Sequence, residues 1–336
     1  MNEDEKMSTL VTFIVVAYNA AATIEALLNN LKRQTYPHDL IEVILVDGCS
    51  RDGTKAAMLR FQNQQTDFRR VAVLDNPKRT LPCGWNVALD AAEGEALLRV
   101  DAHAMIPDRF VEQNVSDLLK GEDICGGKVI SIPANKTKWA IVLNEAENSM
   151  FGGGVAAFRR ADTARYVSTA AFAIYRKTVF DKVGRYNERL TRTEDNEMHY
   201  RMRQAGYRFY YDPEIVSYRK TRSDLKGLTK QKYLNGYWIG RTLWLEPKCF
   251  SLYHFVPLAF VLAIAYSSLL CFFGIWWLSA LVWGAYVIAN LGMTIGAVIN
   301  CRERNVLFVS LPFVFLVLHV GYGVGTIAGI LNSPKK

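Results

Sequence analysis

The chain has 336 residues, a formal net charge of +8 and a composition that is 50% hydrophobic. This length suggests about two domains. Charge is unevenly distributed, because the only charged residues between Phe255 and Ile330 are Arg302, Glu303 and Arg304. Basic residues outnumber acidic ones, but the chain has no motif of aromatic and basic residues that recognises nucleic acid. Nucleic acid is therefore not an expected partner. We therefore expect a soluble domain joined to a membrane region.

The N-terminal segment and the cysteines indicate the compartment. Residues 1–6 are polar and acidic, without the basic start and apolar run of a secretory signal, so we expect the soluble domain in the cytoplasm. The six cysteines are scattered and form no Cys-x-x-Cys pair. Neither a disulfide framework nor a zinc site is expected from this pattern.

The N-terminal part alternates strand patterns with helical patterns. Four apolar runs predict strands, at residues 10–17, 41–46, 71–74 and 96–101. Between them, apolar residues recur at helical spacing, as at Ile24, Leu27, Leu28 and Leu31. The connections are short, which predicts right-handed crossovers. The fold class we expect is α/β, with a doubly wound, mostly parallel sheet.

Polar residues follow three of these predicted strands. Tyr18 and Asn19 follow the first strand, Asp47 ends the second, and Asp101 and His103 lie at the end of the fourth. Ligands of an open α/β sheet bind outside the carboxyl ends of the strands, so these residues predict a ligand crevice. Each of them alone could equally be a helix cap or a turn former. A carboxylate and an imidazole can also hold a divalent cation, and the cation a diphosphate.

After residue 104 the strand and helix patterns no longer alternate regularly. Helices are predicted over 107–121 and 139–150, and strands over 124–132, 172–176 and 207–218. The stretch 151–160 contains three consecutive glycines and two arginines, which predicts either a mobile basic lid or a solvated linker. Glu194 and Asp195 begin a predicted helix, where they either complement the helix dipole or supply a general base. Sequence spacing leaves both alternatives open.

The C-terminal part predicts a membrane region. Residues 219–254 are first basic and then aromatic, which predicts a segment that lies in the interface and contacts either anionic lipid headgroups or a lipid diphosphate. Three apolar runs within 255–331 are each long enough to cross a bilayer. The arginines between the second and third runs then lie inside, as the positive-inside rule prefers, but three crossings would place Lys335 and Lys336 outside. Either the third run is re-entrant or the number of spans is not three.

Several motifs recur together along the N-terminal two thirds of the chain. They are Val15–Asn19, Val46–Thr54, Asn76–Pro77, Gly84–Ala88, Arg99–Ala104, Phe172–Arg176 and Glu194–Asp195. Taken together, they resemble the family 2 inverting glycosyltransferases. The resemblance covers roughly residues 10–245. It is strongest to the succinoglycan type, which builds bacterial exopolysaccharide on a polyprenyl diphosphate carrier.

The resemblance implies a nucleotide-sugar fold and a division of the chain. It implies a nucleotide-sugar-binding glycosyltransferase domain over 1–218, which precedes the basic interface segment over 219–254 and the region of about three membrane helices over 255–331 expected from composition. In this division Tyr18, Asn19, Asp47 and Asp101 would bind the UDP-sugar, with Tyr18 and Asp47 at positions that hold the uracil. Gln231 would lie near the donor diphosphate and the acceptor. The segment after Gln231 lacks the Arg-Trp ending of processive synthases, so a polymerase is not expected.

The resemblance also implies the chemical roles of the remaining residues. Asp101 and His103 match the first and third positions of the family's Asp-x-Asp motif, which holds Mn²⁺ or Mg²⁺ against the donor diphosphate. A histidine at the third position suits Mn²⁺ better than Mg²⁺. Asp195 matches the catalytic base, with Glu194 beside it.

We therefore expect a membrane-associated, inverting, metal-dependent hexosyltransferase with its catalytic domain on the cytoplasmic side of the inner membrane. Its expected partners are a UDP-sugar donor, a lipid-linked oligosaccharide acceptor on polyprenyl diphosphate, and membrane lipids. Two alternatives remain open. One is a transferase whose acceptor is polyprenyl phosphate itself, and the other is a non-catalytic membrane protein that binds a nucleotide-sugar.

Overall fold

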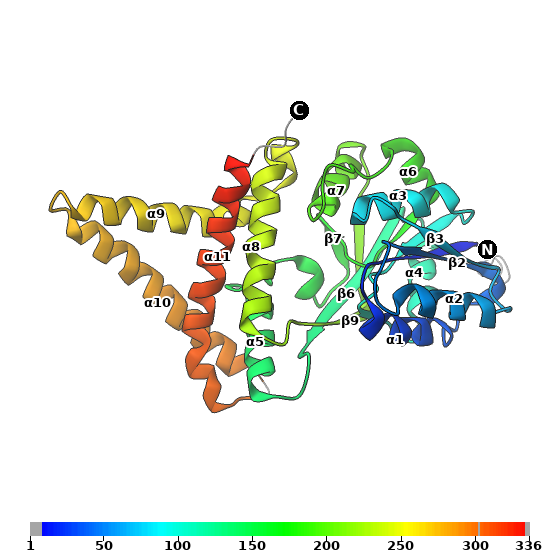
Figure 1. Ribbon diagram of the computed structural model, residues 1–336, viewed down its shortest axis with the longest axis horizontal. Coiled ribbons are helices and arrows are strands. Elements are labelled where there is room, and N and C mark those ends of the chain that lie inside the picture. Colours follow the sequence, from blue (N-terminus) through cyan, green and yellow to red (C-terminus); the bar gives the residue numbers. More distant parts are fainter. Residues whose placement is uncertain (1–8, 302, 333–336) are drawn as a thin grey trace. The chain divides into compact units, whose positions relative to one another are not determined.

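The computed structural model describes residues 9–301 and 303–332 and divides the chain into two compact units (Figure 1). The first unit comprises residues 1–130 and 157–219, and the second comprises residues 131–156 and 220–336. The sequence predicted one unbroken domain over 1–218, whereas the structure groups residues 131–156 with the second unit. The expectations about residues 1–6, Lys335 and Lys336 lie outside the described residues.

One mixed sheet organises the first unit. Its strands are β1 (Val11–Ala17), β2 (Ile41–Asp47), β3 (Arg70–Asp75), β4 (Ala96–Arg99), β5 (Ala104–Met105), β6 (Ile124–Ile132), β7 (Arg165–Val167), β8 (Ile174–Arg176) and β9 (Phe209–Lys220). The strands β3, β2, β1 and β4 are parallel neighbours in that order. The pairs of β4 with β8, β6 with β8, and β9 with β5 and β7 are antiparallel. The expected α/β class is confirmed, and its parallel part is confined to the first four strands.

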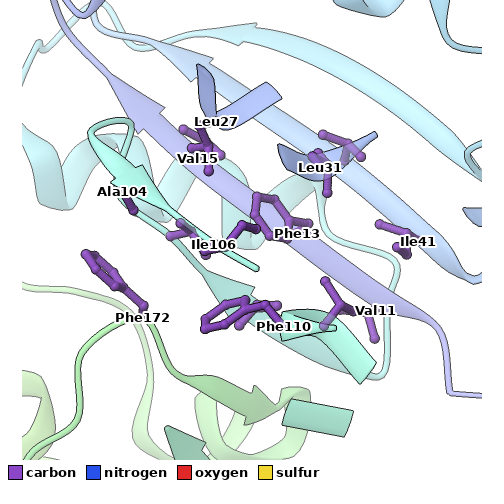
Figure 2. Packing of buried hydrophobic residues seen from close by; sticks show 14 of the residues in the cluster. Val11, Phe13, Val15, Leu27, Leu31, Ile41, Ala104, Ile106, Phe110 and Phe172 are labelled. Atoms are coloured by element: carbon purple, nitrogen blue, oxygen red, sulfur yellow. The ribbon is translucent and has the colours of Figure 1, made fainter. Parts of the chain in front are cut away.

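Helices cover both faces of this sheet. They are α1 (Ala21–Leu31), α2 (Thr54–Gln64), α3 (Leu81–Ala91), α4 (Phe110–Leu119), α6 (Lys177–Val183) and α7 (Glu194–Gln204), with short 3-10 turns η2 (His38–Leu40) and η3 (Ala157–Arg159). Alternate side chains of β1 enter two different cores, which is why every residue of the strand except Thr12 is apolar. Phe13 packs among Leu31, Ile106 and Phe110 on one face (Figure 2). Ile14 joins Trp85 in the cluster on the other face.

A buried carboxylate ties three parts of the sheet region together. Glu42 on β2 is 1% exposed, and its Oε2 accepts hydrogen bonds from Thr12 Oγ1 (2.5 Å) and from the backbone N–H of Glu93 (2.9 Å). Its Oε1 lies 2.6 Å from Nη2 of Arg70. Because the side chain is enclosed, the hydroxyl of Thr12 and the backbone N–H of Glu93 depend on Glu42 as their acceptor.

Glu42→Ala is therefore expected to destabilise the protein. Removal of one member of a buried, hydrogen-bonded pair costs about 3 kcal/mol of unfolding free energy at the lower end of the usual range. The lower end applies because the side chain of Arg70 is 38% exposed, so water partly screens its charge. The check is a urea titration of the detergent-solubilised protein. The matched control is Glu93→Ala, whose 61% exposed side chain also pairs with Arg70 and should contribute at most about 1 kcal/mol. Equal losses in the two variants would contradict this interpretation.

The second unit is helical. It contains α5 (Lys138–Asn148), α8 (Leu225–Thr242), α9 (Val256–Cys271), α10 (Trp276–Asn300) and α11 (Leu311–Leu331), with 3-10 turns η4 (Pro247–Cys249), η5 (Leu252–Phe255) and η6 (Val306–Ser310). Among the described residues, three helical segments are long and apolar enough to cross a membrane: Leu252–Cys271, Trp276–Asn300 and Val306–Leu331. They correspond to the three apolar runs predicted from the sequence.

The triple-glycine segment of this unit is anchored by side chains of α8 and α11. The carbonyl oxygen of Gly152 accepts a hydrogen bond from Lys232 Nζ (2.6 Å), and that of Phe151 accepts one from His319 Nε2 (2.6 Å). A Cβ on Gly152 would lie 1.6 Å from the carbonyl oxygen of Ala146. The close approach of the backbone therefore explains a glycine here, whereas the sequence offered a mobile lid or a solvated linker.

Candidate active site

The loops that follow β1 and β2 are joined by reciprocal hydrogen bonds. The backbone N–H of Asn19 donates to Ser50 Oγ (2.9 Å), and the backbone N–H of Arg51 donates to Asn19 Oδ1 (2.9 Å). Asn19 and Cys49 have φ angles of 48° and 58°, in the left-handed region that asparagine tolerates better than most residues. These bonds hold both loops at the carboxyl edge of the parallel strands.

Tyr18 and Asp47 lie beside each other at this edge, because the register pairs Ala17 with Asp47. Asp47 is 1% exposed, and its Oδ2 accepts a hydrogen bond from the backbone N–H of Ser50 (3.1 Å). Tyr18 is 51% exposed. The structure thus brings Tyr18, Asn19 and Asp47 together at one edge of the sheet. The loop after Asp47 is fixed by hydrogen bonds, and the aromatic ring of Tyr18 is exposed.

Asp101 and His103 follow β4, which is the other parallel neighbour of β1. Nε2 of His103 lies 4.0 Å from Oδ2 of Asp101, and both side chains are partly exposed. Within residues 9–301 and 303–332, no three His, Cys, Asp or Glu side chains are grouped to hold a metal ion. One carboxylate and one imidazole at this separation fit a cation that takes its other ligands from substrate phosphate and water.

A pocket joins this edge to the first turn of α7. It is lined by Arg99, Asp101, Ala170, Ala171, Phe172, Tyr175 and Asp195. Asp101 and Asp195 are 94 positions apart in the sequence and share this pocket. Phe172, which lines the pocket, has a φ angle of 50°, in the left-handed region that residues other than glycine rarely adopt.

Arg99, a residue to which sequence reasoning gave no role, connects the acidic residues of the pocket. Its guanidinium forms an ion pair with Asp195, and Nη2 lies 3.6 Å from Oε1 of Glu194. The guanidinium carbon lies 4.3 Å from the ring centroid of Trp85, and Nη1 donates to the hydroxyl of Tyr186 (3.2 Å). A cation within the apolar run 96–100 was the signal that could have identified Arg99.

The environments of Glu194 and Asp195 displace their pKa values in opposite directions. Burial and the neighbouring charge of Asp195 raise the pKa of Glu194, whose side chain is 3% exposed. Burial acts in the same direction on Asp195, but the charge and hydrogen bond of Arg99 outweigh it and lower the pKa of Asp195. The side chain of Asp195 is 42% exposed. Asp195 is thus the ionised, accessible carboxylate, as a general base must be.

A buried histidine fixes the wall of the pocket. His199 is 1% exposed, and burial lowers the pKa of its imidazole to about 4. Its Nε2 lies 3.0 Å from the hydroxyl of Tyr175, and its Nδ1 lies 2.7 Å from Oγ1 of Thr169. The neutral ring therefore orients Tyr175 through a hydrogen bond without adding charge beside Asp195.

Gln231, the remaining predicted site residue, lies on α8 in the second unit. Its Oε1 accepts a hydrogen bond from Arg222 Nε (3.0 Å), and its Nε2 donates to Glu147 Oε1 (3.4 Å). These contacts are all within the second unit. A position of Gln231 near the donor diphosphate stays a prediction.

The mixed α/β sheet, with acidic residues at the ends of its parallel strands, fits an enzyme that binds its ligands at that edge, and comparison with known proteins identifies the family. Glycosyl transferase family 2 matches residues 12–184, and Glycosyl transferase family group 2 matches residues 100–328. This protein belongs to glycosyltransferase family 2.

Two relatives match almost the whole chain. The Succinoglycan biosynthesis protein ExoA of Rhizobium meliloti (strain 1021) is 30% identical over 100% of this chain and 99% of that protein. A dolichyl N-acetyl-alpha-D-glucosaminyl phosphate 3-beta-D-2,3-diacetamido-2,3-dideoxy-beta-D-glucuronosyltransferase of Methanococcus voltae is 24% identical over 97% of this chain and 99% of that protein.

Solved structures of other transferases show the same fold. The mannosyltransferase PcManGT from Pyrobaculum calidifontis, in complex with GDP-Man and Mn²⁺, has a TM-score of 0.60 and 18% identity over 96% of this chain and 87% of that chain. Residues 1–349 of S. aureus TarS, in complex with UDP-GlcNAc, have a TM-score of 0.50 and 18% identity over 97% of this chain and 93% of that chain. These likenesses establish the fold.

Proposed function

We propose that this protein is an inverting glycosyltransferase of bacterial exopolysaccharide synthesis. It moves a sugar from a UDP-sugar to a lipid-linked oligosaccharide carried on polyprenyl diphosphate. The observation that carries this proposal is the pocket shared by Asp101 and Asp195, in which Asp195 is ionised and accessible. The name of the Rhizobium relative supports the exopolysaccharide pathway, and that of the Methanococcus relative supports a lipid-linked acceptor.

The apolar helices of the second unit support the proposal that the enzyme acts at a membrane. Three apolar helical segments hold the enzyme at a bilayer, where lipid-linked acceptors lie. We place the enzyme in the inner membrane with the first unit on the cytoplasmic side, where nucleotide-sugars are made. Membrane lipids are then its permanent surroundings.

The proposed reaction is a single displacement. The acceptor hydroxyl attacks the anomeric carbon while the bond from that carbon to the phosphate oxygen of UDP breaks, so the configuration inverts. The hydroxyl proton passes to the carboxylate of Asp195, a transfer that typically accelerates such steps by about 10²–10⁴-fold. Arg99 fixes the direction of this carboxylate through their ion pair.

The donor end of the site uses other residues. The exposed ring of Tyr18 offers a stacking surface for uracil, and the loop shaped by Asn19 and Asp47 bounds the nucleoside. Asp101 and His103 would hold Mn²⁺ or Mg²⁺, a Lewis acid that stabilises negative charge on departing UDP.

His103→Asp is expected to change the choice of cation. An all-carboxylate pair suits hard Mg²⁺, whereas the imidazole of His103 suits Mn²⁺. Competition of Mg²⁺ with Mn²⁺, followed by electron paramagnetic resonance in the presence of UDP, should show stronger competition by Mg²⁺ in the variant. Asp101→Asn should weaken Mn²⁺ binding in the same assay by more than about ten-fold, as loss of a ligand exceeds typical outer-shell effects. Unchanged Mn²⁺ binding in Asp101→Asn would contradict the assignment.

Release of UDP from the purified, detergent-solubilised protein tests the proposed function. The reaction contains one of a panel of UDP-sugars and Mn²⁺ or Mg²⁺, with or without a bacterial lipid extract. Lipid-dependent release that disappears in Asp195→Asn supports the proposal and identifies the donor. Bound UDP-sugar without release in any lipid would contradict a transferase and favour the binding protein. Release with polyprenyl phosphate alone, insensitive to Asp195→Asn, would favour the polyprenyl-phosphate transferase.

A further inference from the structure

The apolar helix α11 is accompanied along its length by α8. The two helices run in the same direction (Figure 1), and glycines of α11 mark the contact. The facing pairs are Gly321 with Thr229, Gly325 with Tyr233, and Gly329 with Tyr237. A Cβ on Gly325 would lie 2.2 Å from the carbonyl oxygen of Tyr233, so the backbones touch. The two helices therefore lie at the same depth relative to the membrane.

The composition of α8 is incompatible with the interior of a bilayer. Its 18 residues include Lys226, Lys230, Lys232 and Arg241. A lysine or arginine at the centre of a crossing helix is strongly disfavoured, because its charge leaves water for hydrocarbon. If α11 crossed the membrane, α8 would carry these cations into the hydrocarbon beside it.

The middle of α11 also contacts irregular backbone. His319, near the centre of α11, donates to the carbonyl of Phe151, and Lys232 donates to the adjacent carbonyl of Gly152. The N-terminal half of α11 packs on α5 through Leu311 and Phe315. The helix α5 also carries Glu145 and Glu147. Non-helical backbone at membrane depth occurs only where protein or a water-filled cavity surrounds it. If α11 crossed the membrane, the irregular backbone at Phe151 and Gly152 would lie near the midplane of the bilayer.

The helices α9 and α10 have different surroundings. In the most apolar 18 residues of each segment, 6% of the α9 stretch and 17% of the α10 stretch are buried within the protein. The corresponding share for α11 is 33%. In Figure 1 α9 leaves the α8–α11 pair crosswise and α10 returns toward it obliquely. Their turn carries exposed aromatic residues, Phe272, Phe273, Trp276 and Trp277. Aromatic side chains of this kind gather at the membrane–water interface.

We propose that only α9 and α10 cross the membrane, while α11 lies along the membrane surface with α8. The exposed stripe of α11, formed by Phe313, Val320, Val324 and Leu331, then faces the acyl chains of one leaflet. Two crossings return the chain to the side on which it entered. Arg304 then lies on the side on which the chain entered, as the positive-inside rule prefers when that side is the cytoplasm. This topology does not depend on the proposed function.

Thiol labelling of the full-length protein tests this topology. Glu303→Cys and Asn332→Cys bracket α11, and Phe273→Cys marks the turn between α9 and α10; all three side chains are exposed. A membrane-impermeant maleimide is added to spheroplasts before or after permeabilisation. Mass spectrometry of the labelled peptides separates the introduced thiols from native ones such as Cys271.

We expect Phe273→Cys to be labelled in intact spheroplasts, and the other two variants only after permeabilisation. Labelling of Glu303→Cys and Asn332→Cys from opposite sides would overturn the proposal, because α11 would then cross. Labelling of all three from one side would overturn it as well, because α9 and α10 would not cross. Spin labels at Phe313, Val320 and Leu331 should report equal, shallow depths. A deep label at Val320 between shallow ends would indicate a re-entrant α11 and also overturn the surface position.

Discussion

Asp195→Asn is expected to lower the rate of sugar transfer by about 10²–10⁴-fold while UDP-sugar still binds. The substitution keeps the shape of the side chain but removes the negative charge that accepts the proton of the acceptor. Asp195 is suited to this task because Arg99 outweighs burial and lowers the pKa of its carboxyl. The measurement is kcat for UDP release, with donor affinity from calorimetry.

The neighbouring carboxyl provides the matched control. Burial and the charge of Asp195 raise the pKa of Glu194, so its side chain is close to the neutral form that glutamine imitates. Glu194→Gln should therefore retain much more activity than Asp195→Asn. The reverse order would identify Glu194 as the base and contradict the assignment made from exposure and charge.

Arg99→Gln is expected to move the acid side of the pH–rate profile to higher pH. A base acts only when deprotonated, and Arg99 is the cation that lowers the pKa of Asp195; without it, burial remains and raises that pKa. The plateau rate should also fall, by about 10²-fold, because a misdirected carboxylate no longer meets the acceptor hydroxyl. The measurement is kcat as a function of pH.

Arg99→Lys separates the charge of Arg99 from its geometry. Lysine keeps the cation but lacks the planar fork that reaches Asp195 and Glu194 and stacks on Trp85. We expect the acid side of the profile to stay near that of the natural protein while the plateau falls. Arg185→Gln, at an exposed ion pair with Asp90, controls for general loss of charge. An unshifted profile in Arg99→Gln would show that Arg99 does not set the pKa of Asp195.

Much of the first unit could be predicted from local patterns. The strands β1 and β2 are largely apolar because both of their faces are buried, and their interior polar residues Thr12 and Glu42 are hydrogen-bonded to each other. Asp47 ends β2 and Asp101 follows β4, so polar residues mark both strand ends. The role of Arg99 could not be predicted in this way. Its partner Asp195 lies 96 positions away, and no local pattern connects the two.

The sequence by itself determined the fold class, the family resemblance, the three apolar segments and the identity of the acidic residues. Those features depend on hydropathy and residue type within short segments. Only the tertiary structure brought Asp195 into the pocket of Asp101, separated the pKa values of Glu194 and Asp195, and placed α8 against α11. Burial, ion pairing and membrane depth arise from contacts between residues far apart in the chain, and local composition does not contain them.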